Sequence, residues 1–455
     1  MYWDIGEMDT VPYILGIAHS PGYPLYTLLG WVFTHVVPFG TVAWRMSCLS
    51  ALAMAGAAWF VAQIVIDANG DEVAGLCAAL LFAAGEDAWA HGTRAEPHAL
   101  VTLAYAALLC YVLRWYRTGR ARDLYVTALV FGLGVAVHPV VACALPGILA
   151  AIVARAHETN PRVLRRAAIV ACASAAAWFV YLPLRSAYVN AEHLDPPAQL
   201  GVVGGAFWND GDPVLAGNFV ALVTGGEVRL NGAHLGYSGD AFDRGLVRFV
   251  QLALRESTIA GFVLVLAGAI VIFRRSIGWG IVAFATCAPS ALFACGFAAE
   301  SDVDRYFLPL FVLLAVASGE AIASVRTVLA RRTIVGATAL IVAYLVLSQP
   351  HFFAQPHDDR AAREGAEILR ATPANAIVIS TWVIAPVLAY DDYVLHTTGN
   401  RVVIPAWYGD EEDRIPDWES QRPLFVAGTP QGSVAGHHLE RMPTRTALYR
   451  VVRDQ

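Results

Sequence analysis

The stretch MYWDIGEMDTVPYILGIAHSPGYPLYTL (residues 1–28) opens a chain whose remainder is mostly apolar. It brings together three acidic residues, Asp4, Glu7 and Asp9, with His19 and several prolines. Ionisable side chains beside a bilayer are costly unless they face water, a partner or a substrate. We therefore expect a functional site in this stretch and a membrane-embedded scaffold in the remainder.

The composition indicates the class of protein. Hydrophobic residues make up 57% of the 455 residues and charged residues only 15%, whereas about a quarter of an ordinary soluble domain is charged. These values indicate a polytopic membrane protein. The net charge of -6 provides no basic surface for nucleic acid. The 7 cysteines lie inside or at the ends of apolar runs without paired spacing, so we expect neither disulfides nor a cysteine metal site.

Apolar runs long enough to cross about 30 Å of hydrocarbon define a membrane domain at residues 44–349. They lie at 44–66, 73–90, 97–114, 164–184, 257–273, 278–297, 306–325 and 333–349. The run 123–154 contains His138 followed by Pro139, and proline removes a helical hydrogen bond. We therefore expect two short spans that meet at His138, and about ten spans in all.

Arginine-rich loops predict the orientation of these spans. Arginines cluster at 114–122, 155–166, 274–275 and 326–332, and all four clusters lie on one side only if 123–154 crosses twice. Short cytoplasmic loops collect positive charge, so this side is expected to be cytoplasmic. The opening stretch then lies on the external side.

Three segments are expected outside the membrane. Residues 1–43 are predicted to form a first external loop with the acidic motif and an interfacial helix. Residues 186–245 are rich in Gly, Pro, Asp and Asn, which is typical of a loop. Residues 350–455 alternate helical and strand patterns, which predicts a small α/β domain. The expected fold class is an all-α membrane protein with a small C-terminal α/β domain.

Asp4 and Glu7 are three residues apart. On a helix this spacing places both carboxylates on one face, where they can address the same site. One carboxylate can accept a proton from an attacking hydroxyl while the other orients it or binds a partner. The alternative is that both are solvated loop acids. His19, in the run HSPGYP, could orient a phosphate or an acid, or it could be a structural residue of a rigid turn.

Polar residues near other predicted membrane ends extend this candidate site. Arg185 and Arg305 lie at external ends of spans, where a guanidinium can hold a lipid phosphate through two hydrogen bonds. The alternative for each is an interfacial arginine that reaches toward the headgroups. His138, at the predicted hinge, either belongs to the site or bonds the backbone carbonyls that the break leaves unpaired.

Several blocks of the sequence resemble a known family. The runs DIGE (4–7) and GIAHSPGYPLY (16–26) look like the opening signature of the multi-span family related to protein O-mannosyltransferases, within the GT-C glycosyltransferase superfamily. AEPHAL (95–100), GLGVAVHP (132–139), YLPLR (181–185) and RYFLPL (305–310) are similar to later blocks of that family in order and approximate spacing. The resemblance covers roughly residues 1–325.

The resemblance implies a GT-C-like fold and transfer of a hexose, with mannose favoured, from a polyprenyl-phosphate donor to an acceptor hydroxyl, with inversion. It assigns the catalytic base to Asp4, with Glu7 as its neighbour. It implies a donor-binding or substrate-binding role for His19, Tyr26, Glu96, His98, His138, Arg185, Asp304, Arg305 and Tyr306. The family's HPP-type motif reads His19-Ser20-Pro21 here. Family members generally carry a membrane span before the acidic loop. We expect that this first span is absent from this sequence.

The expected partners are a polyprenyl-phosphate-linked sugar, the lipid bilayer and an acceptor that is a protein, a lipid or a polysaccharide. The sequence indicates no definite cofactor, but the carboxylates of Asp4, Glu7 and Glu96 could bind a divalent cation. A bacterial inner membrane is favoured, with the site facing the periplasm or the exterior.

Two alternatives remain open from the sequence. A transporter or flippase for lipid-linked or small polar substrates would suit His138 and the interrupted helices. A catalytically silent membrane scaffold would carry the same fold.

Overall fold

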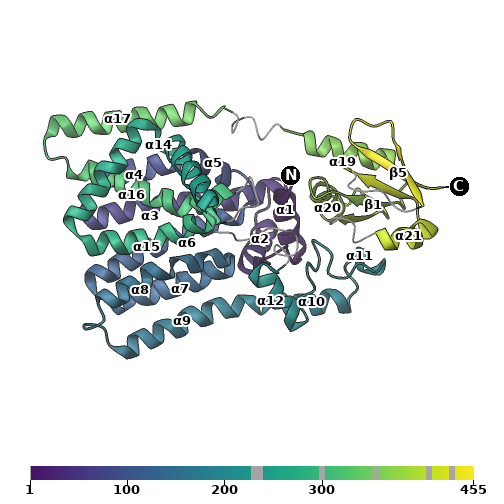
Figure 1. The fold of residues 1–455 in the computed structure, drawn as a ribbon, viewed down its shortest axis with the longest axis horizontal. Helices are drawn as coiled ribbons and strands as arrows, with labels where there is room; N and C mark the ends of the chain where they lie inside the picture. The colour runs from purple at the N-terminus through teal and green to yellow at the C-terminus, as the bar shows by residue number, and fades with distance from the viewer. Residues whose placement is uncertain are drawn as a thin grey trace. The chain divides into compact units, whose positions relative to one another are not determined.

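The computed structural model describes residues 2–226, 239–296, 303–350, 353, 358–405, 412–429 and 436–454 (Figure 1). Residues 227–238 of the predicted external loop therefore lie outside the described residues. The chain divides into two compact units. The helical unit comprises Ser47–Phe179 and Glu227–Phe353, and the mixed unit comprises Met1–Met46, Val180–Gly226 and Ala354–Gln455. Three stretches far apart in the chain thus form the mixed unit.

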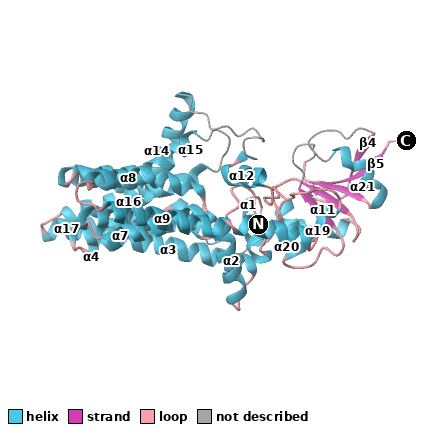
Figure 2. Ribbon diagram, turned by 90° about the horizontal axis from the view of Figure 1, so that it is seen from below, coloured by secondary structure: helices cyan, strands magenta, loops and turns pink. Residues whose placement is uncertain are grey.

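The helical unit consists of long apolar helices, as the composition predicts (Figure 2). It holds most of α3 (Val42–Asn69), then α4 (Glu72–Ala83), α5 (Glu86–Gly92), α6 (Pro97–Thr118), α7 (Ala121–Val137), η1 (Pro139–Ala144), α8 (Leu145–Ala154), α9 (Pro161–Phe179), α14 (Gly239–Arg275), α15 (Ile277–Gly296), η2 (Val303–Phe307), α16 (Leu308–Ser324) and α17 (Val328–Leu347). The elements η1 and η2 are 3₁₀ helices. Among the closest pairs, α14 packs on α16 and α7 packs on α9.

Seven helices among the described residues are long and apolar enough to cross a membrane, and an eighth results if α4 and α5, bent by 68°, form one span. Each of the ten predicted segments falls on a helix or a helix pair. The expected count of about ten is nevertheless too high by this measure, because the two halves of 123–154 are short. Helix α7 has 17 residues, and Pro139–Ala154 is a shorter apolar helix.

The break at His138 is confirmed. Helix α7 ends there, and the chain restarts as η1 at Pro139. The His138 Nδ1 atom accepts a hydrogen bond from the Val140 N–H at 3.0 Å, which satisfies one backbone donor at the start of η1. The histidine therefore caps the helical turn that follows the proline.

The buried carboxylate of Glu256 connects the break within α14 to the break between α4 and α5. Helix α14 has non-helical dihedral angles at Thr258, with φ 62° and ψ 170°. Two residues earlier, Glu256 accepts a hydrogen bond from the Asp87 N–H at 2.7 Å. This N–H lies in the first turn of α5, whose N-cap residue, Gly85, has no side chain to accept it. A Cβ atom on Gly85 would lie 2.0 Å from a Glu256 carboxylate oxygen, so glycine leaves the space that this capping carboxylate occupies.

The mixed unit combines short helices with all the strands among the described residues. Its elements are α1 (Asp4–Ile14), α2 (Pro24–Val36), α10 (Tyr181–Ala191), α11 (Pro196–Gln199), α12 (Ala216–Thr224), α19 (Arg360–Ala371), β1 (Ile377–Ser380), α20 (Ala385–Tyr393), β2 (Val402–Pro405), η4 (Glu412–Arg414), α21 (Ile415–Gln421), β3 (Leu424–Ala427), β4 (His437–Arg441) and β5 (Leu448–Arg453). Helix α1 packs on α2 and on α20, so the N-terminal stretch is part of the same body as the C-terminal sheet.

The sheet has the strand order β2-β1-β3-β5-β4. Strand β1 pairs in parallel with β2 and β3, with Ile377 opposite Val402 and Leu424. Strand β5 pairs antiparallel with β3 and β4. The expected small C-terminal α/β fold is therefore confirmed.

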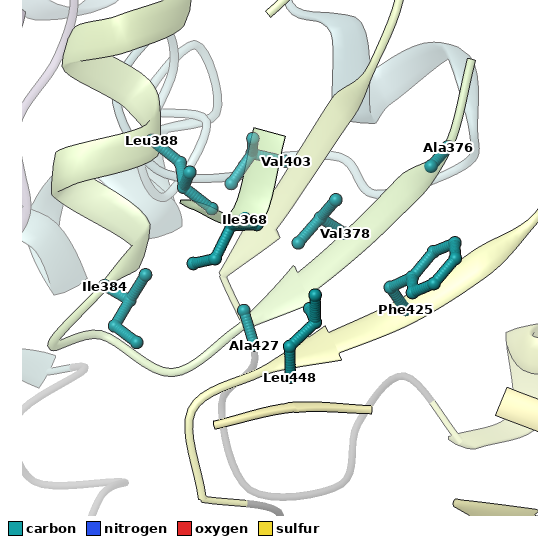
Figure 3. Close-up of a cluster of buried hydrophobic side chains, with 9 residues drawn as sticks. All are labelled: Ile368, Ala376, Val378, Ile384, Leu388, Val403, Phe425, Ala427 and Leu448. Atoms are coloured by element: carbon teal, nitrogen blue, oxygen red, sulfur yellow. The ribbon is translucent and has the colours of Figure 1, made fainter. Parts of the chain in front are cut away.

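Both faces of the parallel strands are buried, which explains why they read as continuous apolar runs. One face packs against α19 and α20 (Figure 3) through Ile368, Ala376, Val378, Ile384, Leu388, Val403, Phe425, Ala427 and Leu448. The other face carries Ile377, Ile379 and Ile404, which pack with Ile415 and Trp418 of α21. Because the sheet is covered on both sides, the loops at the ends of its strands are the places where polar groups can gather.

Candidate active site

The two predicted catalytic acids lie on the first turns of α1, as their spacing predicts. Asp4 is half-buried, and Glu7 is fully buried. After α1 ends, the chain turns back and brings His19 to Glu7. The His19 backbone N–H donates to Glu7 Oε1 at 2.9 Å, and His19 Nδ1 forms an ion pair with Glu7 Oε2. Glu7 is therefore a paired acid, and the alternative of a solvated loop acid is wrong for it.

The charge on His19 follows from its neighbours. Burial alone would lower the pKa of His19, but the negative charges of Glu7 and Asp4 outweigh it and raise the pKa to about 10. The imidazole is therefore protonated at neutral pH, and both ring nitrogens can donate. Nε2 lies 3.2 Å from the Tyr23 hydroxyl. The rigid turn thus holds a cation between the acids and a phenol.

Asp4 receives a hydrogen bond from a residue at the other end of the chain. The indole Nε1 of Trp382, between β1 and α20, donates to Asp4 Oδ1 at 2.8 Å. The Trp382 ring also lies edge-on to the His19 ring, at 6.3 Å between centroids. Phe207 stacks on Trp382, with ring centres 5.7 Å apart and an interplanar angle of 13°. Trp382 is not predicted from the sequence, because nothing in its local sequence links it to a carboxylate 378 residues away.

Asp4, Glu7 and His19 also form a candidate site for a metal ion. One ligand atom from each lies within 4.8 Å of the others. Carboxylate oxygens with an imidazole nitrogen suit Zn²⁺ and Mn²⁺. These three residues are therefore the ones that could hold the divalent cation that the sequence leaves open.

Other polar residues of the opening stretch have internal roles. Asp9 is buried, and its Oδ1 atom has no hydrogen-bond partner among the described residues. Burial raises the pKa of Asp9 to about 7. Tyr26, a predicted binding residue, is fully buried, and its hydroxyl donates to the Met8 carbonyl at 3.4 Å. This bond ties α2 to α1, and a role for Tyr26 in binding stays a prediction.

Arg185 holds the end of α1. Its Nε donates to the Leu15 carbonyl at 2.6 Å, and a terminal nitrogen donates to the Ile14 carbonyl at 3.1 Å. These carbonyls lie at the C-terminus of the helix, where cations are favoured. The guanidinium also lies 5.7 Å from the centre of the Trp208 ring. Neither sequence interpretation, phosphate binding or headgroup contact, anticipated this role, and phosphate binding by Arg185 stays a prediction.

A second polar cluster lies in the helical unit. Glu96, the N-cap residue of α6, accepts a hydrogen bond from His98 Nδ1 at 2.7 Å. The His98 ring lies 5.0 Å from the His138 ring and 5.1 Å from the Tyr306 ring. The guanidinium of Arg305 lies 5.6 Å from the centre of the Tyr306 ring. The structure therefore brings together five of the residues predicted for binding.

Asp304 is also predicted to bind the donor or substrate, but its hydrogen bonds go to a residue outside this cluster. Both of its carboxylate oxygens accept hydrogen bonds from Arg248, at 2.8 and 2.6 Å. Two residues that the sequence analysis did not select join the cluster instead. Arg94 lies 3.8 Å from Glu96 and 3.2 Å from the Nε2 atom of His91. Their signal was present in the sequence, since both lie within seven residues of His98.

Comparison with solved structures identifies the fold. ArnT from Cupriavidus metallidurans in the apo state matches with a TM-score of 0.60 over 98% of this chain and 93% of that chain, at 11% sequence identity. ArnT from the same organism bound to undecaprenyl phosphate matches with a TM-score of 0.60 over the same shares, at 10% identity. The chain therefore has the fold of ArnT. With its membrane-length helices the protein is an integral, multi-pass membrane protein.

The sequence comparisons show which proteins the first part of the chain resembles. Residues 4–161 match the model of the protein O-mannosyl-transferase TMEM260 N-terminal domain. The protein O-mannosyl-transferase TMEM260 of Mus musculus is 31% identical over 191 residues, which are 40% of this chain and 27% of that protein. The corresponding protein of Dictyostelium discoideum is 32% identical over 115 residues, 25% of this chain and 14% of that protein. The match thus spans about a quarter or less of these curated relatives. The predicted resemblance to the protein O-mannosyltransferase-like family is confirmed.

Proposed function

We propose that this protein is a GT-C-type glycosyltransferase that moves a sugar, with mannose favoured, from a polyprenyl-phosphate donor to an acceptor hydroxyl. The observation that carries the proposal is the arrangement around Asp4. A carboxylate near the start of α1 is oriented by the Trp382 indole and stands beside the buried Glu7–His19 ion pair. The names of the relatives support a mannosyl donor, and the undecaprenyl phosphate bound to ArnT supports a polyprenyl phosphate.

In the proposed reaction Asp4 is the general base. Its carboxylate accepts the proton of the acceptor hydroxyl, and the hydroxyl oxygen attacks the anomeric carbon of the donor. The bond from this carbon to the phosphate oxygen breaks, and the polyprenyl phosphate leaves with the electron pair. A single displacement of this kind inverts the configuration at the anomeric carbon.

The neighbours of Asp4 have different roles in this proposal. Trp382 fixes the orientation of the carboxylate, because its N–H donates to one oxygen. Glu7 positions His19 and keeps it protonated, so that a cation stands beside the base. Arg185 and Arg305 stay the arginines proposed for the donor phosphate, and Arg185 is also bonded to the carbonyls at the end of α1.

A divalent cation is a further part of the proposal. Asp4, Glu7 and His19 would hold it, and it would supply positive charge next to the leaving phosphate. Because Glu7 and His19 are already paired, a bound cation would have to replace that ion pair. Transfer that EDTA abolishes and Mn²⁺ restores would support the cation, and transfer unaffected by EDTA would exclude it.

The location follows the same reasoning. The arginine-rich loops support an orientation in which the opening stretch faces away from the cytoplasm. We place the protein in a bacterial inner membrane with its site facing the periplasm or the exterior. Accessibility of a cysteine introduced at exposed Trp3 to a membrane-impermeant reagent in intact cells tests this orientation.

The test of the function is transfer of radiolabelled sugar from polyprenyl-phosphate mannose or glucose in membranes that contain the chain. Asp4→Asn should lower transfer by roughly a hundredfold or more, because a general base contributes about 10²- to 10⁴-fold. Trp382→Phe, which keeps an aromatic ring but removes the N–H donor, should lower transfer less. Asp417→Asn, at an exposed position of α21, is the matched control and should leave transfer unchanged.

The outcomes separate the proposal from its alternatives. Full transfer by Asp4→Asn would refute Asp4 as the base. A folded protein that translocates the lipid-linked sugar without transferring it would be a flippase, and one that does neither would be a scaffold.

A further inference from the structure

The mixed unit contains a cavity of about 820 Å³ that the proposed reaction has not used. Its lining comes from the last turns of α1 and α2, from residues 194–208, and from the chain just before β1, β2 and β3. The volume is in the range of small-molecule sites, about 300–1,000 Å³. Six of the residues that line it carry the argument: Tyr13, His35, Trp208, Asn375, Tyr393 and Arg422.

Aromatic rings form two walls of this cavity. Tyr13 and His35 stack with their ring centres 5.0 Å apart and an interplanar angle of 15°. Trp208 and Tyr393 meet edge-to-face at 5.8 Å. A pyranose ring has an apolar C–H face that packs on such rings and hydroxyl groups at its edge. The cavity offers matching groups for those hydroxyls in the amide of Asn375 and the guanidinium of Arg422.

One polar group of this lining is buried without a partner. The indole Nε1 of Trp208 is buried and has no hydrogen-bond partner among the described residues. Buried polar groups in native proteins are rarely left unpaired, because the loss is costly. A hydroxyl group of a ligand on the Trp208 ring would give this N–H a partner.

The same wall is connected to Asp4. Phe207, the neighbour of Trp208 in the chain, stacks on Trp382, whose indole donates to Asp4. The Trp208 carbonyl accepts a hydrogen bond from the Ile17 N–H at 3.2 Å, two residues before His19. A ligand on Trp208 therefore sits against the segment that holds the proposed base and its partners.

We infer that this cavity binds a saccharide of one or two hexose units that forms part of the acceptor. The acceptor role rests on the proposed function, whereas the binding itself does not. An extended peptide is the less favoured occupant. Strand β2 is at the edge of the sheet, but α11 packs on it, so pairing with a peptide strand would first have to displace that helix.

The test is binding of methyl α-D-mannopyranoside and mannobiose to the purified full chain, followed by isothermal calorimetry. Trp208→Phe, which keeps an aromatic ring but removes the five-membered ring with its N–H, should weaken binding roughly tenfold or more, since the loss of one hydrogen bond alone has about that effect. Trp208→Ala should weaken it further. The matched control is Trp44→Phe, at an exposed tryptophan outside the lining, and it should bind as the wild type does. Gel filtration confirms that each variant is folded.

The binding experiment also includes the Asp4→Asn variant and a peptide as a competing ligand. Asp4→Asn should bind the saccharides normally, so binding without transfer would count against the proposed function and not against the cavity. Transfer by a protein that does not bind either saccharide at tens of millimolar would overturn the cavity site and leave the function. Saccharide binding that is unchanged in Trp208→Ala, or binding of a Ser- and Thr-containing hexapeptide in place of the saccharides, would also overturn it.

Discussion

Replacement of Glu7 by glutamine tests whether the buried ion pair holds the opening stretch together. The substitution keeps the shape of a fully buried side chain and removes its charge. In the wild type both oxygens of Glu7 are bonded to His19, one to its N–H and one to its ring. Breaking a fully buried ion pair costs about 3–5 kcal/mol. Because the His19 side chain is 22% exposed and Asp4 stays beside it, the loss here should lie at or below the lower end of this range. We expect Glu7→Gln to lower the unfolding temperature of the protein by several degrees at pH 6.5.

The pH dependence makes this prediction specific. The pKa of His19 rises from 6.5 in the unfolded chain to about 10 in the folded protein, so the folded state binds its proton more tightly. The stabilisation is complete below about pH 6.5 and is lost as the pH rises toward 10. The difference between wild type and Glu7→Gln should therefore be largest at pH 6.5 and small near pH 10.

The assay is thermal unfolding of the detergent-solubilised chain at several pH values, followed by tryptophan fluorescence. Glu158→Gln is the control, because it removes an ion pair with Arg155 in which the glutamate is 67% exposed, and such pairs contribute about 0–1 kcal/mol. A wild-type unfolding temperature for Glu7→Gln at pH 6.5, or an equal loss at every pH, would refute the reasoning.

Three further substitutions follow from other contacts. Burial raises the pKa of Asp195 from 3.8 to about 7, so the folded protein keeps this carboxyl protonated at low pH and is destabilised by its charge as the pH rises through 7. Asp195→Asn should therefore raise the unfolding temperature at pH 8 and hardly change it at pH 4. The pKa shift corresponds to at most roughly 4 kcal/mol of unfolding free energy. Gly16→Ala should destabilise the protein strongly, because the new Cβ would lie 1.8 Å from the Phe207 carbonyl oxygen, while Gly217→Ala, with nothing within 4 Å, should be neutral in the same melting assay. Glu256→Ala should leave the N-terminus of α5 uncapped and speed hydrogen exchange of its first amides, with a smaller effect for Glu256→Gln; unchanged exchange would contradict the capping role.

The sequence predicts what depends on local pattern. Apolar runs mark the helices, because length and hydropathy are properties of a single segment, and the break at His138 follows from the proline beside it. The spacing of Asp4 and Glu7 gives their common place on α1 for the same reason. The count of spans is less secure, because hydropathy does not show that the two helices within 123–154 are each slightly short.

Contacts between residues far apart in the chain cannot be predicted from local sequence patterns. Arg185 could equally hold a phosphate or a carbonyl, and only the fold shows that the end of α1 lies against it. The partner of Asp304 is Arg248, and the partner of the first turn of α5 is Glu256; neither choice has a sequence signal. In each case the residue type limits the chemistry, and the tertiary structure selects the partner.

The bond between Asp4 and Trp382 constrains when this protein can become active during its synthesis. The two residues are 378 positions apart, so at about 5–20 residues per second a ribosome needs roughly 20 to 75 s to make the second after the first. The carboxylate gains its indole donor only after the helices from α3 to α17 have been made and the segment around β1 and α20 has folded. A nascent chain that has not yet reached Trp382 therefore carries an incomplete site.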